Sequence, residues 1–541
     1  MEDDMKNSDY FLSEELFKNI CGDKHKSFFL FAGAGSGKTF TLVHILKLIN
    51  DTSGDRLRRE QRKVAVITYT NAATDEIKRR IDYNDLFQVS TIHSFIWDII
   101  QPYQSAIKSL YLSYIRKDIV ELQKDIDEAS NTTTKKYQNN IEKLKALRLR
   151  LEAKGQIDKF VYNPNGDNLE SNSLNHSDVI KIGADLILRN KLFRKIIAQQ
   201  YPFMFVDESQ DTQKTMVDAF FSIQKDFSDI FTLGFIGDQK QRIYMDGKIG
   251  IVNSIPEDWQ KPELVTNYRS SKRVIRLANK IASYLDGFTQ NPTPTVSEGY
   301  VRFFLVDNNS EIDKYEKERK VCEMMLELTG DEEWNIEKGD VKVLILEHRM
   351  AAMRLGFEKF HNLFARLPKY QMSYLQGTMP EMTMFSHALF PIMECLSKDR
   401  MVELLELLKK YSPLLAAVPN TDYVERLHEL SAILKVLKKY SSSSVSVAEC
   451  VTFIRETNFL EIPEVLVEAL DTPLEGIEDK VLMAWKQALD LPLRELKRYD
   501  DYVNERTIFA THQGVKGLEY PRVLVLIDNK VTNSTMINYL K

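Results

Sequence analysis

Several features are scarce in this chain of 541 residues. It has only four cysteines, and no two of them form a CxxC pair, so neither a zinc or iron–sulfur site nor a disulfide scaffold is expected. The sequence contains no run of about 18 apolar residues, so it predicts no membrane span. The acidic start, Met1 to Met5, does not resemble a signal peptide. We therefore expect a cytoplasmic protein that makes no membrane contact.

The chain also lacks an excess of positive charge, with 73 lysines and arginines against 78 aspartates and glutamates. This balance argues against a protein that coats nucleic acid through bulk charge. It still allows a local cleft that grips a strand. The hydrophobic share of 43% and the charged share of 28% are typical of globular protein.

Short, continuous apolar runs recur along the chain, with helical patterns between them. Continuous runs are typical of parallel strands that are covered on both faces. The expected fold class is therefore α/β with parallel sheets. The runs are 28–31, 64–67, 203–206, 235–236, 343–346 and 523–527.

Two helical stretches interrupt this pattern. From about Ser105 to Lys154, two apolar stripes with spacings of three and four predict an antiparallel helical hairpin. Its second arm is basic and either contacts a duplex or a partner protein, or is a solvated helical face. The basic residues are Lys135, Lys136, Lys143, Lys145, Arg148, Arg150 and Lys154. The second stretch, 367–496, carries helical patterns and no chemical motif.

A glycine-rich segment follows the first expected strand and opens a helix: Ala32-Gly33-Ala34-Gly35-Ser36-Gly37-Lys38-Thr39. In this context, glycines let backbone N–H groups turn toward phosphate oxygens, and the helix N-terminus adds partial positive charge. We expect Lys38 to reach the β and γ phosphates and the Thr39 hydroxyl to bind Mg²⁺. Ala32 departs from the strict pattern, which has glycine there. The alternative is a glycine-rich turn that binds no phosphate.

An acidic pair, Asp207-Glu208, follows the third expected strand. Asp207 is expected to hold Mg²⁺ directly or through water, and Glu208 to orient and deprotonate the attacking water. Acidic turns are common, but together with the upstream P-loop this pair predicts ATP or GTP hydrolysis.

Further segments follow in an order that resembles the UvrD/Rep/PcrA-like superfamily 1 DNA helicases. Segment 207–212 resembles the DExQDT box of that family, segment 68–73 resembles its FTNKAA box, and segment 90–95 resembles its TFHSF box. Segment 237–244 resembles the GDxxQSIY box, segment 267–271 resembles the NYRS box, and segment 510–520 resembles the THxxKGLEF box. From Ala32 to Tyr520 these motifs cover almost the whole chain. A P-loop kinase or GTPase would leave the boxes after Asp211 unexplained.

The resemblance implies two RecA-like P-loop NTPase domains, each carrying a helical insertion. Residues 1–100 and 176–265 would form the first domain, with the hairpin insertion at 101–175. Residues 266–366 and 497–541 would form the second domain, with the insertion at 367–496.

The resemblance also assigns roles in the ATP site. Gln241 is expected to sense the γ-phosphate, and Gln210 to act as a relay between the acidic pair and the DNA cleft. From the second domain, Tyr268 would stack on adenine, Arg269 would reach the γ-phosphate and Glu519 would contact the ribose.

Several positions match residues that contact the DNA strand in the resembled family, and their side chains have chemistry that suits DNA binding. Aromatic rings stack on unpaired bases without base selectivity, and hydroxyl and amide groups bond phosphates without reading sequence. The alternatives are core packing for the aromatic residues and structural roles for the histidines. These positions are Tyr69, Thr70, Asn71, His93, Tyr244, Thr511 and His512.

These motifs predict an ATP-dependent 3′-to-5′ translocase or helicase that acts on single-stranded DNA or single/double-strand junctions. The resemblance alone implies the polarity. The second hypothesis is a nucleotide-gated, DNA-sensing regulatory subunit of a repair or anti-phage complex, with a partner such as a nuclease.

The chain departs from the resembled family in three places. No arginine-containing last box follows Tyr520, so we expect a truncated chain that binds ATP but turns it over poorly. An N-terminal glutamine that reads adenine has no match near Phe11 to Phe17. Asp246 stands where an aromatic residue usually follows the tyrosine of the fourth box.

Overall fold

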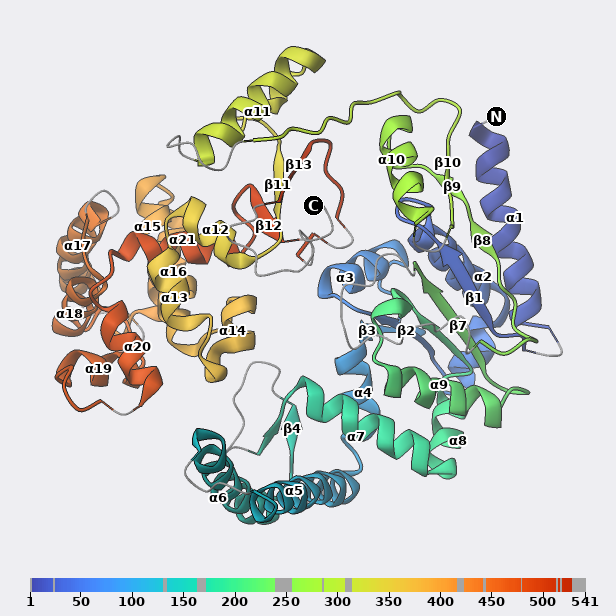
Figure 1. Cartoon of the computed structure of the whole chain (residues 1–541), viewed down its shortest axis with the longest axis horizontal. Coiled ribbons are helices and arrows are strands. Elements are labelled where there is room, and N and C mark those ends of the chain that lie inside the picture. Colours follow the sequence, from blue (N-terminus) through green and yellow to red (C-terminus); the bar gives the residue numbers. More distant parts are fainter. Residues whose placement is uncertain are drawn as a thin grey trace. The chain divides into compact units, whose positions relative to one another are not determined.

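The computed structural model divides the chain into two compact units, unit 1 (Met1–Phe303) and unit 2 (Phe304–Lys541), each with α/β structure (Figure 1). No helix among the residues that it describes is long and apolar enough to cross a lipid bilayer. It describes residues 2–22, 25–129, 134–162, 172–238, 255–284, 287–306, 314–415, 423–440, 444–477, 479–511, 514–515 and 518–527.

Unit 1 is built around a six-stranded sheet with the order β3-β2-β6-β7-β1-β8. All neighbouring strands pair in parallel. The four apolar runs expected to be strands in this part of the chain are confirmed. The strands are β1 (Phe28–Ala32), β2 (Val64–Thr68), β3 (Phe87–Thr91), β6 (Phe203–Val206), β7 (Thr232–Gly237) and β8 (Glu263–Leu264).

Helices cover both faces of this sheet, which explains why β1 and β6 are apolar at every position. Phe29, Ile67 and Phe235 bury against one helical layer, and Phe28, Leu30 and Phe205 bury against the other. The first layer contains α4 (Ile92–Ile100), α7 (His176–Arg189), α8 (Lys191–Gln200) and α9 (Lys214–Asp226). The second contains α1 (Glu2–Ile20), α2 (Lys38–Arg59) and α3 (Asn71–Arg80).

The expected helical hairpin forms from α5 (Gln104–Asp127) and α6 (Lys135–Gly155), which lie side by side (Figure 1). Ile126 and Leu144, one from each predicted stripe, are buried. Thr134 caps α6, because its side chain accepts a hydrogen bond from the backbone N–H of Tyr137 at 3.2 Å. Two short parallel strands, β4 (Val161–Tyr162) and β5 (Ser173–Leu174), follow the hairpin.

The basic arm of this hairpin is not a uniformly solvated face. Lys154 is fully buried and donates to the backbone carbonyl of Ser173 at 3.4 Å. Burial lowers the pKa of Lys154 to about 8. Arg150 donates to the hydroxyl of Tyr111. Lys154 and Arg150 therefore help to fix α6 against its neighbours. A duplex-binding surface on α6 could use only the other basic residues of this helix.

Unit 1 ends with α10 (Lys272–Ala282) and a pair of short parallel strands, β9 (Thr266–Asn267) and β10 (Asn291–Pro292). Residues 266–303, which the sequence analysis assigns to the second domain, therefore group with unit 1. The predicted domain ranges themselves stay a prediction.

Unit 2 has a three-stranded parallel sheet of order β12-β11-β13. Its strands are β11 (Lys342–Ile345), β12 (Phe509–Thr511) and β13 (Val523–Leu526), and the runs at 343–346 and 523–527 are thus confirmed as strands. Its helices are α11 (Lys314–Thr329), α12 (His348–Leu355), α13 (Glu358–Phe364), α14 (Gln371–Gln376), α15 (Phe390–Ser397), α16 (Met401–Tyr411), α17 (Tyr423–Tyr440), α18 (Val447–Thr457), α19 (Glu464–Asp471), α20 (Lys480–Ala488) and α21 (Leu493–Val503).

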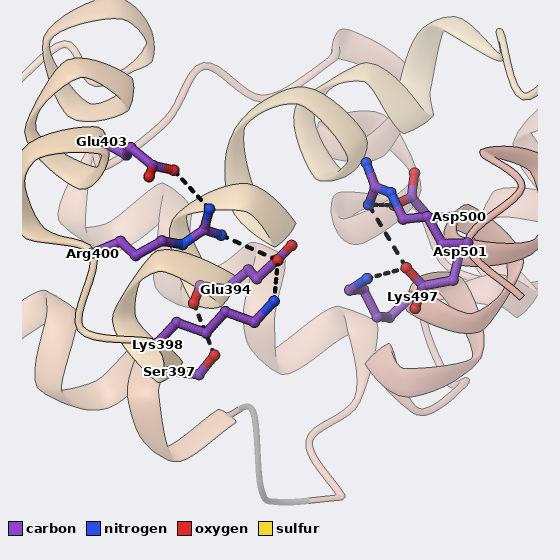
Figure 2. Close-up of polar contacts among 9 residues, drawn as sticks. Glu394, Ser397, Lys398, Arg400, Glu403, Lys497, Asp500 and Asp501 are labelled. Atoms are coloured by element: carbon purple, nitrogen blue, oxygen red, sulfur yellow. Dashed lines mark hydrogen bonds and ion pairs between the residues drawn. The ribbon is translucent and has the colours of Figure 1, made fainter. Parts of the chain in front are cut away.

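A network of charges fixes the corner between α15 and α16 (Figure 2). Arg400 donates to Glu403 at 2.8 Å and to Glu394 at 3.1 Å. Glu394 also accepts a hydrogen bond from Lys398 at 2.8 Å, and these contacts lower the pKa of Glu394. Because the side chains are partly exposed, each pair contributes little stability.

We predict that Gly234→Ala destabilises unit 1. A Cβ at position 234 would lie 2.6 Å from the Phe28 ring and 2.7 Å from the Phe205 ring. The free energy of unfolding should fall by about 1–3 kcal/mol through overpacking. Gly155→Ala is the control, since a Cβ there meets nothing within 4 Å. Urea unfolding that shows equal stability for the two variants would contradict this packing.

Candidate nucleotide-binding site

The sheet of unit 1 brings three chemically important loops to one edge. Loops that follow parallel strands all leave from the carboxyl ends of those strands. β1 leads into the glycine-rich loop, β6 into Asp207, and β7 into Asp238. Because β7 lies between β6 and β1, segments far apart in the sequence become neighbours.

The glycine-rich loop forms a tight turn at the start of α2. Gly35 and Gly37 have left-handed φ values of 69° and 87°, which explains the need for glycine at both positions. The Ser36 hydroxyl donates to the carbonyl of Gly33 at 2.8 Å, and Lys38 Nζ donates to the carbonyl of Ala32 at 3.3 Å. The partial positive charge of the α2 N-terminus therefore lies beside the loop.

The acidic pair lies close to this loop. Glu208 Oε1 is 3.9 Å from Lys38 Nζ. Asp207 is buried, and its Oδ1 accepts a hydrogen bond from the backbone N–H of Glu208 at 2.9 Å. Glu208 has a φ of 49°, a left-handed conformation that is uncommon outside glycine. A strained backbone at this position is typical of functional sites, and the metal-binding and base roles of the pair stay predictions.

Gln210 joins the acidic pair to the end of β7. Its Nε2 donates to Glu208 Oε2 at 2.5 Å, and its Oε1 accepts from the backbone N–H of Asp238 at 3.1 Å. A Cβ at Gly237 would lie 2.5 Å from Gln210 Oε1, so only glycine leaves room for this bridge. These contacts join the acidic pair to the segment that follows β7, and the relay to a DNA cleft stays a prediction. Gln241 and Tyr244, further along the same segment, lie outside the described residues.

Two buried amide side chains hold the outer side of the glycine-rich loop. Asn267 Nδ2 and Gln290 Nε2 donate to the carbonyl of Ala34 at 2.9 and 3.1 Å. The backbone N–H of Tyr268 donates to the carbonyl of Gly35 at 2.8 Å. Asn267 lies in the segment that resembles NYRS, but that resemblance assigned no role to its side chain. Gln290 lies in no motif, so no sequence signal pointed to it.

Arg269 stands next to the loop for a local reason. The Asn267 side chain accepts backbone hydrogen bonds from Arg269 at 3.0 Å and from Ser270 at 2.8 Å, which turns the chain sharply. A Cβ at Gly35 would lie 2.6 Å from Arg269 Cβ. Tyr268 is 38% exposed. The structure thus places Tyr268 and Arg269 beside the loop within unit 1.

The predicted strand-contacting residues after β2 begin α3. Thr70 is its N-cap, and the Thr70 hydroxyl accepts from the N–H of Ala73 at 3.2 Å. Tyr69 is half-buried and Asn71 is exposed. A capping role accounts for a hydroxyl at position 70 without DNA, whereas nothing in the fold requires Asn71 to be polar.

His93, in α4, packs against His176 at the start of α7, directly after the insertion. Its ring centroid is 4.1 Å from that of His176, and the Tyr162 hydroxyl lies 2.6 Å from His176 Nδ1. Burial, with a smaller contribution from His176, lowers the pKa of His93 to about 3. His93 is therefore neutral near pH 7 and would contact DNA as a hydrogen-bonding group, not as a charge. The packing of His93 is also consistent with the alternative that this histidine has a structural role and does not contact DNA.

The remaining predicted positions belong to unit 2. Thr511 is buried at the end of β12, and its hydroxyl accepts from the N–H of Gly514 at 3.3 Å. Glu519 is exposed. His512 lies outside the described residues. The ribose and DNA roles of these residues stay predictions.

Part of the chain matches a known protein family, and individual known proteins are similar to it over different shares of its length. Residues 12–245 match the UvrD/REP helicase N-terminal domain family. The chain is 22% identical to the Gabija protein GajB of Bacillus cereus strain HuB5-5, over 95% of this chain and 86% of that protein. It is 23% identical to the ATP-dependent DNA helicase PcrA of Staphylococcus epidermidis, over 92% of this chain and 75% of that protein. Against the ATP-dependent DNA helicase Rep of Buchnera aphidicola, identity is 28% over 47% of this chain and 42% of that protein.

The histidine cluster predicts a pH dependence of stability. The folded pKa of His93, about 3, lies below the ordinary value of 6.5. Between these values the unfolded chain binds a proton that folded His93 does not, so stability should fall as the pH drops from about 7 to about 5. His93→Gln should lose less thermal stability than the parent over this range.

His387→Gln is the matched control, because His387 is exposed in unit 2. It should show the parent's loss of stability. An identical loss for His93→Gln would contradict the burial of a neutral His93.

Proposed function

We propose that the chain is an ATP-dependent DNA helicase or translocase. The proposal proceeds from the match of residues 12–245 to the UvrD/REP helicase N-terminal domain family. One observation carries the proposal. Lys38, Asp207 and Glu208 come together at one sheet edge, and Gln210 connects this group to the segment that begins at Asp238. The arrangement combines a hydrolysis site with a direct link to a second segment.

Each residue of the site has chemistry that suits ATP hydrolysis. The Thr39 hydroxyl and the Asp207 carboxylate are oxygen ligands of the kind that Mg²⁺ prefers, and Mg²⁺, when bound with the nucleotide, neutralises phosphate charge. Lys38 adds positive charge at the phosphates. Glu208 is the general base that takes a proton from the attacking water. Gln241, Tyr268, Arg269 and Glu519 complete the proposed site.

Coupling to DNA follows from the position of Gln210. A change in the contacts of Glu208 reaches the backbone of Asp238 through one side chain. We infer that the segment after β7, which includes Tyr244, follows the state of the nucleotide. Tyr69, Thr70, Asn71, His93, Thr511 and His512 would supply the other strand contacts, with 3′-to-5′ movement along single-stranded DNA.

A second candidate is a nucleotide-gated DNA-sensing subunit of a repair or anti-phage complex. The similarity to the Gabija protein GajB, which extends over 95% of this chain, motivates it. Such a subunit would bind ATP and DNA at the same residues but unwind little. It would act with a protein partner such as a nuclease.

Glu208→Gln should abolish turnover while ATP still binds. Loss of a general base costs about 10²- to 10⁴-fold in rate, whereas the P-loop is unchanged. Phosphate release should be measured with and without single-stranded DNA. Glu152→Gln, at an exposed position in α6, is the matched control.

The two candidates separate in the same assay. Phosphate release by the parent chain that DNA does not increase would argue against the motor. DNA-stimulated ATP binding without strand separation would favour the sensing subunit.

Gln210→Met should uncouple hydrolysis from DNA. Methionine has a similar length but forms neither the bond to Glu208 nor the bond to Asp238. We expect the stimulation by DNA to fall about 10- to 150-fold, as for the loss of a hydrogen bond to a charged group, with a smaller change in basal turnover. Equal losses of basal and DNA-stimulated turnover would contradict the relay.

A further inference from the structure

The carbonyl of Ala34 is held by an unusual pair of donors. Asn267 Nδ2 and Gln290 Nε2 both donate to it, and Asn267 Nδ2 also lies 3.2 Å from Gln290 Oε1. The two residues are only 4% and 8% exposed. Buried amides that share one backbone oxygen fix its direction, because an unpaired buried amide is costly.

Fixing this carbonyl also fixes the neighbouring N–H group. In a trans peptide unit, the C=O and N–H point in opposite directions, and the backbone of this chain contains no cis bond among the described residues. With the Ala34 carbonyl held toward Asn267 and Gln290, the N–H of Gly35 points to the other side of the loop. An N–H in that direction is what a phosphate-binding loop requires.

Gln290 is itself held by α10. Asn279 Nδ2 donates to the backbone carbonyl of Gln290 at 2.8 Å, and Asn279 Oδ1 accepts from the N–H of Gln290 at 2.9 Å. Gln290 also lies directly over Gly33, where a Cβ would come within 2.6 Å of its amide. A continuous series of hydrogen bonds therefore runs from α10 through Gln290 to the glycine-rich loop.

We propose that Gln290 is a positioning residue for the P-loop: it orients the Ala34–Gly35 peptide for phosphate and connects that peptide to α10 through Asn279. The inference rests on the proposed nucleotide-binding function. It assigns a role to a residue outside every helicase motif of the sequence. It also implies that phosphate binding and the position of α10 influence each other.

The test is nucleotide affinity in a Gln290→Leu variant of the full chain. Leucine fills a similar volume but donates no hydrogen bond. A fluorescent ATP analogue and Mg²⁺ should bind about three- to tenfold more weakly, as for the loss of one or two neutral hydrogen bonds. Gln290→Asn, which keeps an amide on a shorter chain, should recover part of the affinity. Gln156→Leu makes the same change at an exposed position and should bind like the parent.

A second variant separates positioning from folding. Asn279→Ala leaves the Gln290 amide in place, and alanine suits a helix, so unit 1 should fold. Its affinity should fall by about two- to threefold, less than for Gln290→Leu, because one support of Gln290 is lost. Thermal unfolding of each variant without nucleotide shows whether a lower affinity merely reflects lost stability.

The outcomes have distinct meanings. Parental affinity in both variants would overturn the role of Gln290 and leave the proposed function standing. A lower affinity that is fully explained by unfolding would also overturn the role. A parent chain that binds no nucleotide would overturn the proposed function and this inference with it.

Discussion

The parallel arrangement of the unit 1 strands is the constraint on which the site depends. Parallel strands need helical connections, and these helices bury both faces of the sheet. All the strands then end at one edge, so Lys38 and Glu208, which are 170 positions apart in the numbering, come within 3.9 Å. An antiparallel sheet of the same apolar runs would place successive loops at opposite edges. The chemistry of the site is thus a consequence of strand direction.

Backbone groups at this edge are held mainly by amide side chains. Gln210 contacts Glu208 and the N–H of Asp238, while Asn267 and Gln290 hold the carbonyl of Ala34. An amide can donate and accept at the same time, so it can join two segments without adding a charge beside the glycine-rich loop. Glycines at 33, 35 and 237 leave room for these side chains. The glycine-rich sequence therefore serves packing against amides as well as backbone flexibility.

The helical insertion is more than a surface addition to unit 1. Its basic arm buries Lys154, and His176, in the helix that follows β5, packs against His93 in α4. A residue that matches a DNA-contacting position therefore also forms part of the junction with the insertion. Burial keeps this imidazole neutral, so any contribution to strand binding depends on geometry and hydrogen bonding, and less on salt than a cationic contact would.

The sequence by itself determined the α/β class, the strands β1, β2, β6, β7, β11 and β13, the helical hairpin and the glycine-rich and acidic motifs, whereas it did not predict the strands β3, β8 and β12. Those features follow from local patterns: apolar runs, helical spacing and short segments whose chemistry is contiguous. Only the tertiary structure decided that Tyr268 and Arg269 lie in unit 1, that Lys154 is buried and that Gln290 supports the loop. Gln290 is 256 positions from Ala34. Its role depends on two chain segments meeting, and no periodicity or motif along a single segment encodes such a meeting.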